Sequence, residues 1–243
     1  MGSDTFSNSK NYLAKAVKLI AATCLSFLYL SLLMVLLLKW VDPPTTSFML
    51  QREINVAWDK NTDFNLKYRW ADWDEISPYV KVAAITSEDQ RFAEHWGLDI
   101  NAIQEAIAEH QKGESLRGAS TITQQVAKNL FLWSGQSFIR KGIEAYFALT
   151  IEMLWSKKRI LEVYLNIAEF GNGVYGVKAA SETYFNTAPK NLDMLQSALM
   201  VTALPSPRRY NLSDPSPYMI DRRNWILQYM FYLGNTDYLK KIE

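Results

Sequence analysis

The sequence predicts a mostly α-helical domain preceded by one N-terminal transmembrane helix. An uncharged apolar run of about 20 residues occupies Leu19–Leu38, long enough to cross the hydrocarbon core of a bilayer. Beyond it, apolar residues recur mainly at helical spacing, and the alternation typical of strands is nearly absent. Roughly 200 residues remain after the run, enough for one domain with its own core.

Composition narrows the classes of function. The formal net charge is +1, so wholesale nucleic-acid binding is not expected. The single cysteine, Cys24, falls inside the apolar run, so neither a disulfide framework nor a cysteine metal site is available. His95 and His110 are the only histidines, too few for a histidine metal site.

The apolar run predicts an uncleaved anchor. A secretory signal peptide has a shorter apolar region followed by small residues, whereas here Lys39-Trp40-Val41-Asp42 follows. Lysines at positions 10, 15 and 18 precede the run, and by the positive-inside rule they place the N-terminus in the cytoplasm and residues 40–243 outside it.

The helices after the anchor are predicted from apolar periodicity and end signals. Ser77-Pro78 is a helix start, and Thr121 with Gln124 has the spacing of a capping box. Residues 48–76 lack a clean period and leave room for a small hairpin, and GNGVYG from Gly171 is a turn. Helices are expected at about 98–112, 121–133, 138–155, 157–168, 176–185, 191–203 and 216–233, the last ending at Gly234.

Two glutamates are candidates for acid–base chemistry. Glu88 and Glu144 each lie among apolar residues on a predicted helix. Two carboxylates in different environments of one cleft are the usual equipment for chemistry at a sugar anomeric carbon. The plainer interpretation, a pair of surface or salt-bridged glutamates, is not excluded by spacing alone.

Cations accompany these glutamates. Arg140, Lys141 and Glu144 share one side of a helix, where the plain interpretation is an ordinary ion pair. Lys128, on the preceding helix, continues the face of Gln124 and Gln125. Cations beside amides and a helix N-terminus suit a phosphate or diphosphate. We interpret His95 as bracing the loop at Gly97, and Ser120 lacks a histidine at a recognisable spacing to make it a nucleophile.

Four ordered motifs within about 80 residues are similar to those of the peptidoglycan glycosyltransferases. The first, E-D-x-x-F-x-x-H-x-G, begins at Glu88, and the second, G-x-S-T-I-T-Q-Q, begins at Gly118. The third, R-K-x-x-E, begins at Arg140, and the fourth, K-x-x-I-L-E-x-Y-L-N, begins at Lys157. The resemblance covers about residues 70–235. No S-x-x-K and K-T-G set follows, so we expect a monofunctional member.

The resemblance implies a lysozyme-like fold with a smaller membrane-facing lobe, and it implies roles for residues. Glu88 would be the general base in an inverting transfer that elongates glycan strands from lipid II and releases undecaprenyl diphosphate. Glu144 would organise the donor site. The expected substrate-binding residues are Lys128, Arg140, Lys141, Ser120, Gln124, Gln125 and Asn129. Glu162, Tyr164 and Asn166 would mainly support the site.

The implied organisation has four parts: a cytoplasmic tail at 1–18, a transmembrane helix at 19–38, a linker and membrane-proximal segment at 39–69, and the glycosyltransferase domain at 70–243. The expected partners are lipid II, the nascent glycan strand and the membrane, with room for other cell-wall synthesis proteins and none for nucleic acid. The catalytic domain would be periplasmic on a single-pass anchor in the bacterial inner membrane. No cofactor is required, and a divalent metal is compatible.

Two departures from the family pattern affect donor binding. Gln136 stands where many relatives carry arginine, and Glu105 lies near another position where bifunctional relatives carry one. Two rival functions stay open: a lytic enzyme, which would not need the cations Lys128, Arg140 and Lys141, and a non-catalytic scaffold, which would not need the glutamates. The segment 98–112 could face the membrane or pack on the core.

Overall fold

The computed structural model describes residues 3–59, 64–102, 104, 120–135 and 137–243. They form two compact units, residues 1–41 and 42–243, which are described separately below. The segment expected at 98–112 lies largely outside the described residues, as do both departures, Glu105 and Gln136.

The first unit contains one long helix, α1 (Ser3–Leu38). Its stretch Lys15–Leu38 has 24 residues and a hydropathy of 2.4, so it is long and apolar enough to cross a membrane. The helix also includes residues that the sequence assigned to a separate tail, so the boundary at residue 18 remains a prediction about function.

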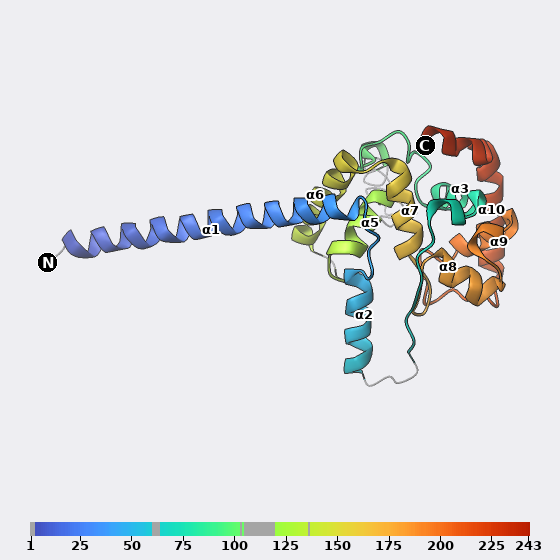
Figure 1. The fold of residues 1–243 in the computed structure, drawn as a ribbon, viewed down its shortest axis with the longest axis horizontal. Helices are drawn as coiled ribbons and strands as arrows, with labels where there is room; N and C mark the ends of the chain where they lie inside the picture. The colour runs from blue at the N-terminus through green and yellow to red at the C-terminus, as the bar shows by residue number, and fades with distance from the viewer. Residues whose placement is uncertain (1–2, 60–63, 103, 105–119, 136) are drawn as a thin grey trace. The chain divides into compact units, whose positions relative to one another are not determined.

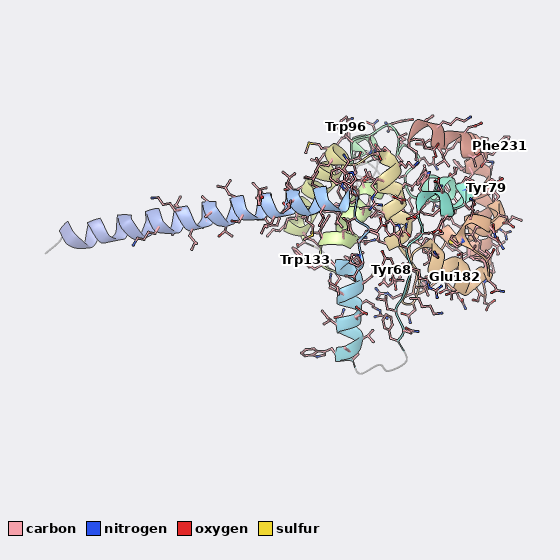
Figure 2. The ribbon with its side chains drawn as sticks, viewed as in Figure 1. Tyr68, Tyr79, Trp96, Trp133, Glu182 and Phe231 are labelled. Carbon is pink, nitrogen blue, oxygen red and sulfur yellow. The ribbon has the colours of Figure 1, made fainter. Side chains whose placement is uncertain are left out.

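The second unit begins with a helix that the sequence did not predict. Helix α2 (Ser47–Trp58) is N-capped by Thr46, whose Oγ1 accepts a hydrogen bond from the Met49 amide at 3.1 Å. The Nε2 of Gln51 donates to the Leu132 carbonyl at 2.9 Å, and its Oε1 accepts from the amide of Ser134 at 2.7 Å. Trp133 therefore lies beside the beginning of α2, where Figure 2 labels it.

Three short strands form a small sheet in the described part of this unit, in the order β1-β3-β2. Strand β1 (Lys67–Tyr68) pairs in parallel with β3 (Val174–Tyr175), which pairs antiparallel with β2 (Glu169–Gly171). The predicted hairpin within 48–76 is therefore wrong. The hairpin lies instead at the predicted GNGVYG turn, where Gly173 has a φ of +77°.

Two groups of helices build the core, as Figure 1 shows. In one, α3 (Pro78–Glu88) packs against α9 (Met194–Val201), α10 (Pro217–Tyr232) and the 3₁₀ segment η4 (Asn235–Lys241). In the other, α5 (Ile122–Phe131) packs against α6 (Phe138–Leu154) and α7 (Lys157–Ile167). Contacts between α3 and α7 join the groups.

Most of the predicted helices are confirmed. Ser77 caps α3 with Pro78 at its first position, the Thr121–Gln124 capping box begins α5, and Gly234 follows α10 with a φ of +88°. The helix expected at 176–185 is α8 (Val177–Ala180), which continues as a π-helical turn, η2 (Ser181–Phe185). Short 3₁₀ turns lie at η1 (Trp73–Glu75) and η3 (Pro189–Asn191).

Helix α3 explains the position of the first candidate catalytic residue. Its residues Val80–Thr86 are buried, so the core holds the helix on nearly all sides. Glu88 is its last residue, placed where the chain leaves this core and approaches α5.

Candidate active site

Glu88 lies at the end of α3 with both carboxylate oxygens engaged. Its Oε1 accepts a hydrogen bond from Ser87 Oγ at 3.1 Å, and its Oε2 accepts one from Gln125 Nε2 at 3.0 Å. The side chain is half-buried on the wall of a cavity of about 320 Å³. The residues lining this cavity are Thr86, Ser87, Glu88, Asp89, Gln90, Arg91, Asp99, Ala102, Ser120 and Thr121.

Burial raises the pKa of Glu88 above its ordinary value, because the carboxylate loses water when it is enclosed. Hydrogen bonds from Gln125 and Ser87, and then the positive charges of Arg222 and Lys128, act in the opposite direction and favour the ionised form. A carboxylate with a raised pKa is a stronger base than an exposed one, which suits it to accept a proton from a sugar hydroxyl.

Gln125 is oriented by a buried tyrosine. The Tyr164 hydroxyl, on α7, donates to Gln125 Oε1 at 3.4 Å, which leaves the amide nitrogen of Gln125 facing Glu88. Burial raises the pKa of Tyr164 well above its ordinary value, so the hydroxyl keeps its proton and stays a donor. Residues from α3, α5 and α7 thus fix one carboxylate.

Asp89 ties the next stretch of chain to the start of α5. Its Oδ1 lies 2.8 Å from His95 Nε2, and its Oδ2 accepts the Ile122 amide at 3.0 Å. The Thr121 hydroxyl donates to the Gly97 carbonyl at 2.6 Å. His95 therefore braces this region as predicted, through Asp89, while Thr121 holds Gly97.

A second cavity of about 400 Å³ is lined in part by Gln125. Gln125, Lys128 and Asn129 of α5 form one part of its wall. The other lining residues are Phe48, Ile167, Ala168, Glu169, Tyr175, Leu204, Pro205, Ser206, Pro207, Arg208 and Arg209. The hydrogen bond between Glu88 and Gln125 thus joins residues of two neighbouring cavities.

Lys128 interacts electrostatically with a group of charged residues on α6, Arg140, Lys141 and Glu144, called the α6 cluster below. Burial lowers the pKa of Lys128 from its ordinary value, the charge of Glu144 opposes this, and Arg140 and Lys141 add to the lowering. Lys128 is therefore close to the positive charges of Arg140 and Lys141, and an incoming dianion would neutralise their mutual repulsion.

Glu144 is the buried centre of the α6 cluster. Its side chain is 3% exposed, with Arg140 Nη1 at 2.9 Å from Oε2 and Lys141 Nζ in contact with Oε1. A buried carboxylate paired with two cations is satisfied, and it fixes where those cations point. Ser137 caps this helix by accepting the Arg140 amide at 3.1 Å.

The predicted site residues fall into three neighbouring places. Ser120 lies with Glu88 on the first cavity, Gln125, Lys128 and Asn129 line the second, and the Arg140–Lys141–Glu144 cluster lies next to Lys128. They are therefore close together without lining one single cleft. Gln124 differs from the expectation: it is 3% exposed and bonded to Thr121 in the capping box, so it supports α5.

The fourth motif supports the site through backbone contacts. Asn166 Oδ1 accepts the Ala71 amide at 2.8 Å, and its Nδ2 donates to the Ala71 carbonyl at 2.9 Å. Glu162 Oε1 accepts the Trp73 amide at 2.7 Å. These side chains fasten the segment before α3 to α7, in agreement with the predicted supporting role.

Several residues near the site were not identified from the sequence. Arg222 of α10 donates to the Ser87 carbonyl at 3.4 Å and influences Glu88. Arg208 and Arg209 line the second cavity. Each belongs to an adjacent Arg-Arg pair, which is the only local signal. Among the described residues, no group of three or more His, Cys, Asp or Glu side chains is arranged to hold a metal ion.

Comparison with known proteins agrees with this geometry. A family model described as "Transglycosylase" matches residues 58–231. The chain is 49% identical over 210 residues to a "Biosynthetic peptidoglycan transglycosylase" of Pseudomonas savastanoi, covering 86% of this chain and 89% of that protein. A protein of the same name from Stutzerimonas stutzeri is 46% identical over 234 residues, covering 96% and 95%. The chain therefore belongs to the transglycosylase family.

Proposed function

We propose that this chain is a peptidoglycan polymerase that elongates glycan strands from lipid II. The observation that carries the proposal is the pairing of a base with a cation. Glu88 lines the first cavity and is hydrogen-bonded to Gln125, which lines the second cavity together with Lys128, near the α6 cluster. The relatives named above as peptidoglycan transglycosylases support the same reaction class.

In the proposed reaction, the acceptor is lipid II and the donor is the growing strand. Glu88 takes the proton from the 4-hydroxyl of the acceptor's N-acetylglucosamine, and that oxygen attacks the donor's anomeric carbon. The bond from that carbon to the diphosphate oxygen breaks, which inverts the configuration and forms a β-1,4 linkage. Undecaprenyl diphosphate leaves with the bonding electron pair.

The cations are proposed to stabilise the negative charge of the leaving diphosphate. We assign Lys128, which lines the second cavity, to the diphosphate as negative charge develops on it, because preorganised charge of this kind is a large source of rate acceleration. We assign Arg140 and Lys141 to the same anion, with Glu144 as the positioning residue that fixes them. Ser120 and Asn129 would contact the substrate from the walls of the two cavities.

The apolar stretch Lys15–Leu38 fits this substrate. Lipid II keeps its lipid in the bilayer and presents its sugars at the surface, so an anchored enzyme meets it at a high effective concentration. We propose a single-pass anchor in the inner membrane, with the N-terminus in the cytoplasm and residues 40–243 in the periplasm. Protease added to right-side-out vesicles, which expose the periplasmic face, should digest the catalytic unit, and protection of this unit until the vesicles are opened would contradict the orientation.

The alternatives are a lytic enzyme acting on the same glycan and a non-catalytic scaffold. A lytic enzyme expels no diphosphate and has no use for the cations around Lys128. A scaffold has no use for a carboxylate with a raised pKa in a cleft.

The experiment is incubation of the purified full chain in detergent with labelled lipid II, with preformed glycan in a parallel reaction. We expect lipid II to be converted into a polymer that muramidase digests, with the preformed glycan left intact. Degradation of preformed glycan without polymerisation would establish the lytic alternative, and no reaction with either substrate would support the scaffold.

A further inference from the structure

Arg209 lines two cavities of the surface. It lines the second cavity, with Gln125, Lys128 and Asn129, and it also lines a third cavity, with Tyr210, Ser216 and Tyr218. The proposed donor side of the site therefore continues along the chain segment between α9 and α10, beyond the residues of the four motifs.

The segment that carries Arg209 is held in a defined turn. The amides of Arg209 and Tyr210 both donate to the Ser206 carbonyl, at 2.9 and 3.1 Å. The preceding Arg208 is tied to the sheet, since its Nε lies 3.3 Å from Oε2 of Glu169. Ser206 stands between two prolines that restrict the backbone on either side. Arg209 itself is exposed at the edge of both the second and the third cavity.

The third cavity is lined by a stacked aromatic pair. The ring centroids of Tyr210 and Tyr218 are 5.6 Å apart with an angle of 20° between the ring planes. Tyr218 lies in the first turn of α10, whose N-cap is Ser216, and it is 56% exposed. A pair of tyrosines presents a flat apolar face with a hydroxyl at its edge, a surface suited to a sugar ring with apolar faces and polar edges.

We propose that Arg209, Tyr210 and Tyr218 form a distal subsite that holds the nascent glycan strand several sugars away from the reacting bond. The inference rests on the proposed function and adds to it a binding site that begins with Arg209 at the second cavity and continues to Tyr210 and Tyr218, away from the residues of the four motifs. The tyrosine pair takes a sugar ring of the strand, and Arg209 pairs with a carboxylate of the peptides that the strand carries, since a guanidinium binds carboxylates in a fixed, bidentate geometry.

Such a subsite has a specific consequence for the product. After each transfer the strand must stay on the enzyme while a new lipid II binds. A second contact distant from the reacting bond makes rebinding of a partly released strand intramolecular. The subsite therefore favours long strands, and it contributes less to the coupling of the first two lipid II molecules, because no nascent strand is bound during that step.

The test compares Tyr218→Ala and Arg209→Ala with the wild-type full chain on lipid II. Two quantities are measured: the initial rate at which lipid II is coupled, and the length distribution of the glycan on a gel. The matched control is Phe231→Ala, which removes an exposed aromatic side chain, labelled in Figure 2, from the last turn of the same helix, whereas Tyr218 lies in the first turn. Thermal melting checks that each variant is folded.

We expect Tyr218→Ala to shorten the mean strand by about two- to ten-fold, the effect of losing one aromatic contact, and to reduce the initial coupling rate by a smaller factor. Arg209→Ala should shorten strands made from peptide-bearing lipid II more than strands made from a lipid II whose peptide is removed. Phe231→Ala should match the wild type in both quantities.

Unchanged strand length in Tyr218→Ala would overturn the subsite, and so would a fall in length and coupling rate by the same factor. If Arg209→Ala shortens strands equally with and without the peptide, Arg209 does not bind a peptide carboxylate, and the subsite contacts only the sugars. A wild-type chain that makes no polymer would instead contradict the proposed function, so the two failures are distinguishable.

Discussion

The Nε2 of Gln125 donates a hydrogen bond to Oε2 of Glu88 across 3.0 Å, linking α5 to the end of α3. This contact stabilises the ionised carboxylate that a general base needs. Gln125 also lines the cavity that holds Lys128, so one side chain contacts the proposed base and lines the proposed anion site.

Removing this amide should weaken the base without removing it. In Gln125→Met the side chain keeps its length but cannot donate, so Glu88 loses both its orientation and one interaction that lowers its pKa. We expect kcat/KM for lipid II to fall by about 10- to 100-fold. The matched control is Gln228→Met on the exposed face of α10, which should keep wild-type kinetics. Equal kinetics for the two variants would contradict the role of Gln125.

The pH dependence of the reaction should respond to Arg222. The reactive form of Glu88 is ionised, so activity is lost as pH falls through its pKa, which burial has raised above the ordinary value of 4.5. The charge of Arg222 lowers that pKa, so Arg222→Gln raises it further and moves the acid limb of kcat/KM to higher pH. Arg222→Lys keeps a positive charge and should move it less. A limb that moves to lower pH in Arg222→Gln would contradict this account.

Loss of the Lys128 charge should reduce activity more than loss of the nearby charge of Lys141. Lys128 lines the cavity beside Gln125, whereas the side chain of Lys141 is 48% exposed. We expect Lys128→Met to reduce kcat/KM by about 100-fold through loss of charge stabilisation at the leaving diphosphate, and Lys141→Met to reduce it clearly less. Steady-state kinetics on both variants measure this order, and the reverse order would move the anion site toward α6.

Asn166 should contribute to stability rather than to chemistry. Its amide makes hydrogen bonds to both backbone groups of Ala71 and to the Glu162 carbonyl, all without solvent exposure of the side chain. Asn166→Ala leaves buried backbone groups unpaired and should lower the free energy of unfolding by about 2–4 kcal/mol. Denaturant unfolding of the variant checks this value. Asn224→Ala on the exposed face of α10 should change it little.

The sequence predicted most helices because their ends carry local signals. Ser77-Pro78, the Thr121–Gln124 box and Gly234 act within a few residues of the chain, and each lies where it was expected. Helix α2 was not predicted because its apolar residues follow no clean period and its contacts, such as Gln51 with Leu132, are distant in sequence. The strand β1 likewise depends on a partner more than 100 residues later.

The site was predictable where its residues occur in motifs and not where packing alone assembles it. The motifs identified Glu88, Lys128 and the α6 cluster. They could not show that Gln124 is turned inward as a cap, because a capping glutamine and a substrate-binding glutamine look alike in sequence. Arg222 and Arg209 reach the site from helices and turns at the far end of the chain, with no local signal of their destination.

The most direct test of the central claim, that Glu88 is the base of a polymerising transfer, is lipid II polymerisation by Glu88→Gln beside the wild type. Glutamine keeps the shape of the side chain and one acceptor oxygen but cannot accept the proton. We predict that the wild type makes muramidase-sensitive polymer and that the variant, folded as judged by an unchanged melting temperature or a higher one, makes none. Polymerisation at equal rates by both proteins would contradict the claim.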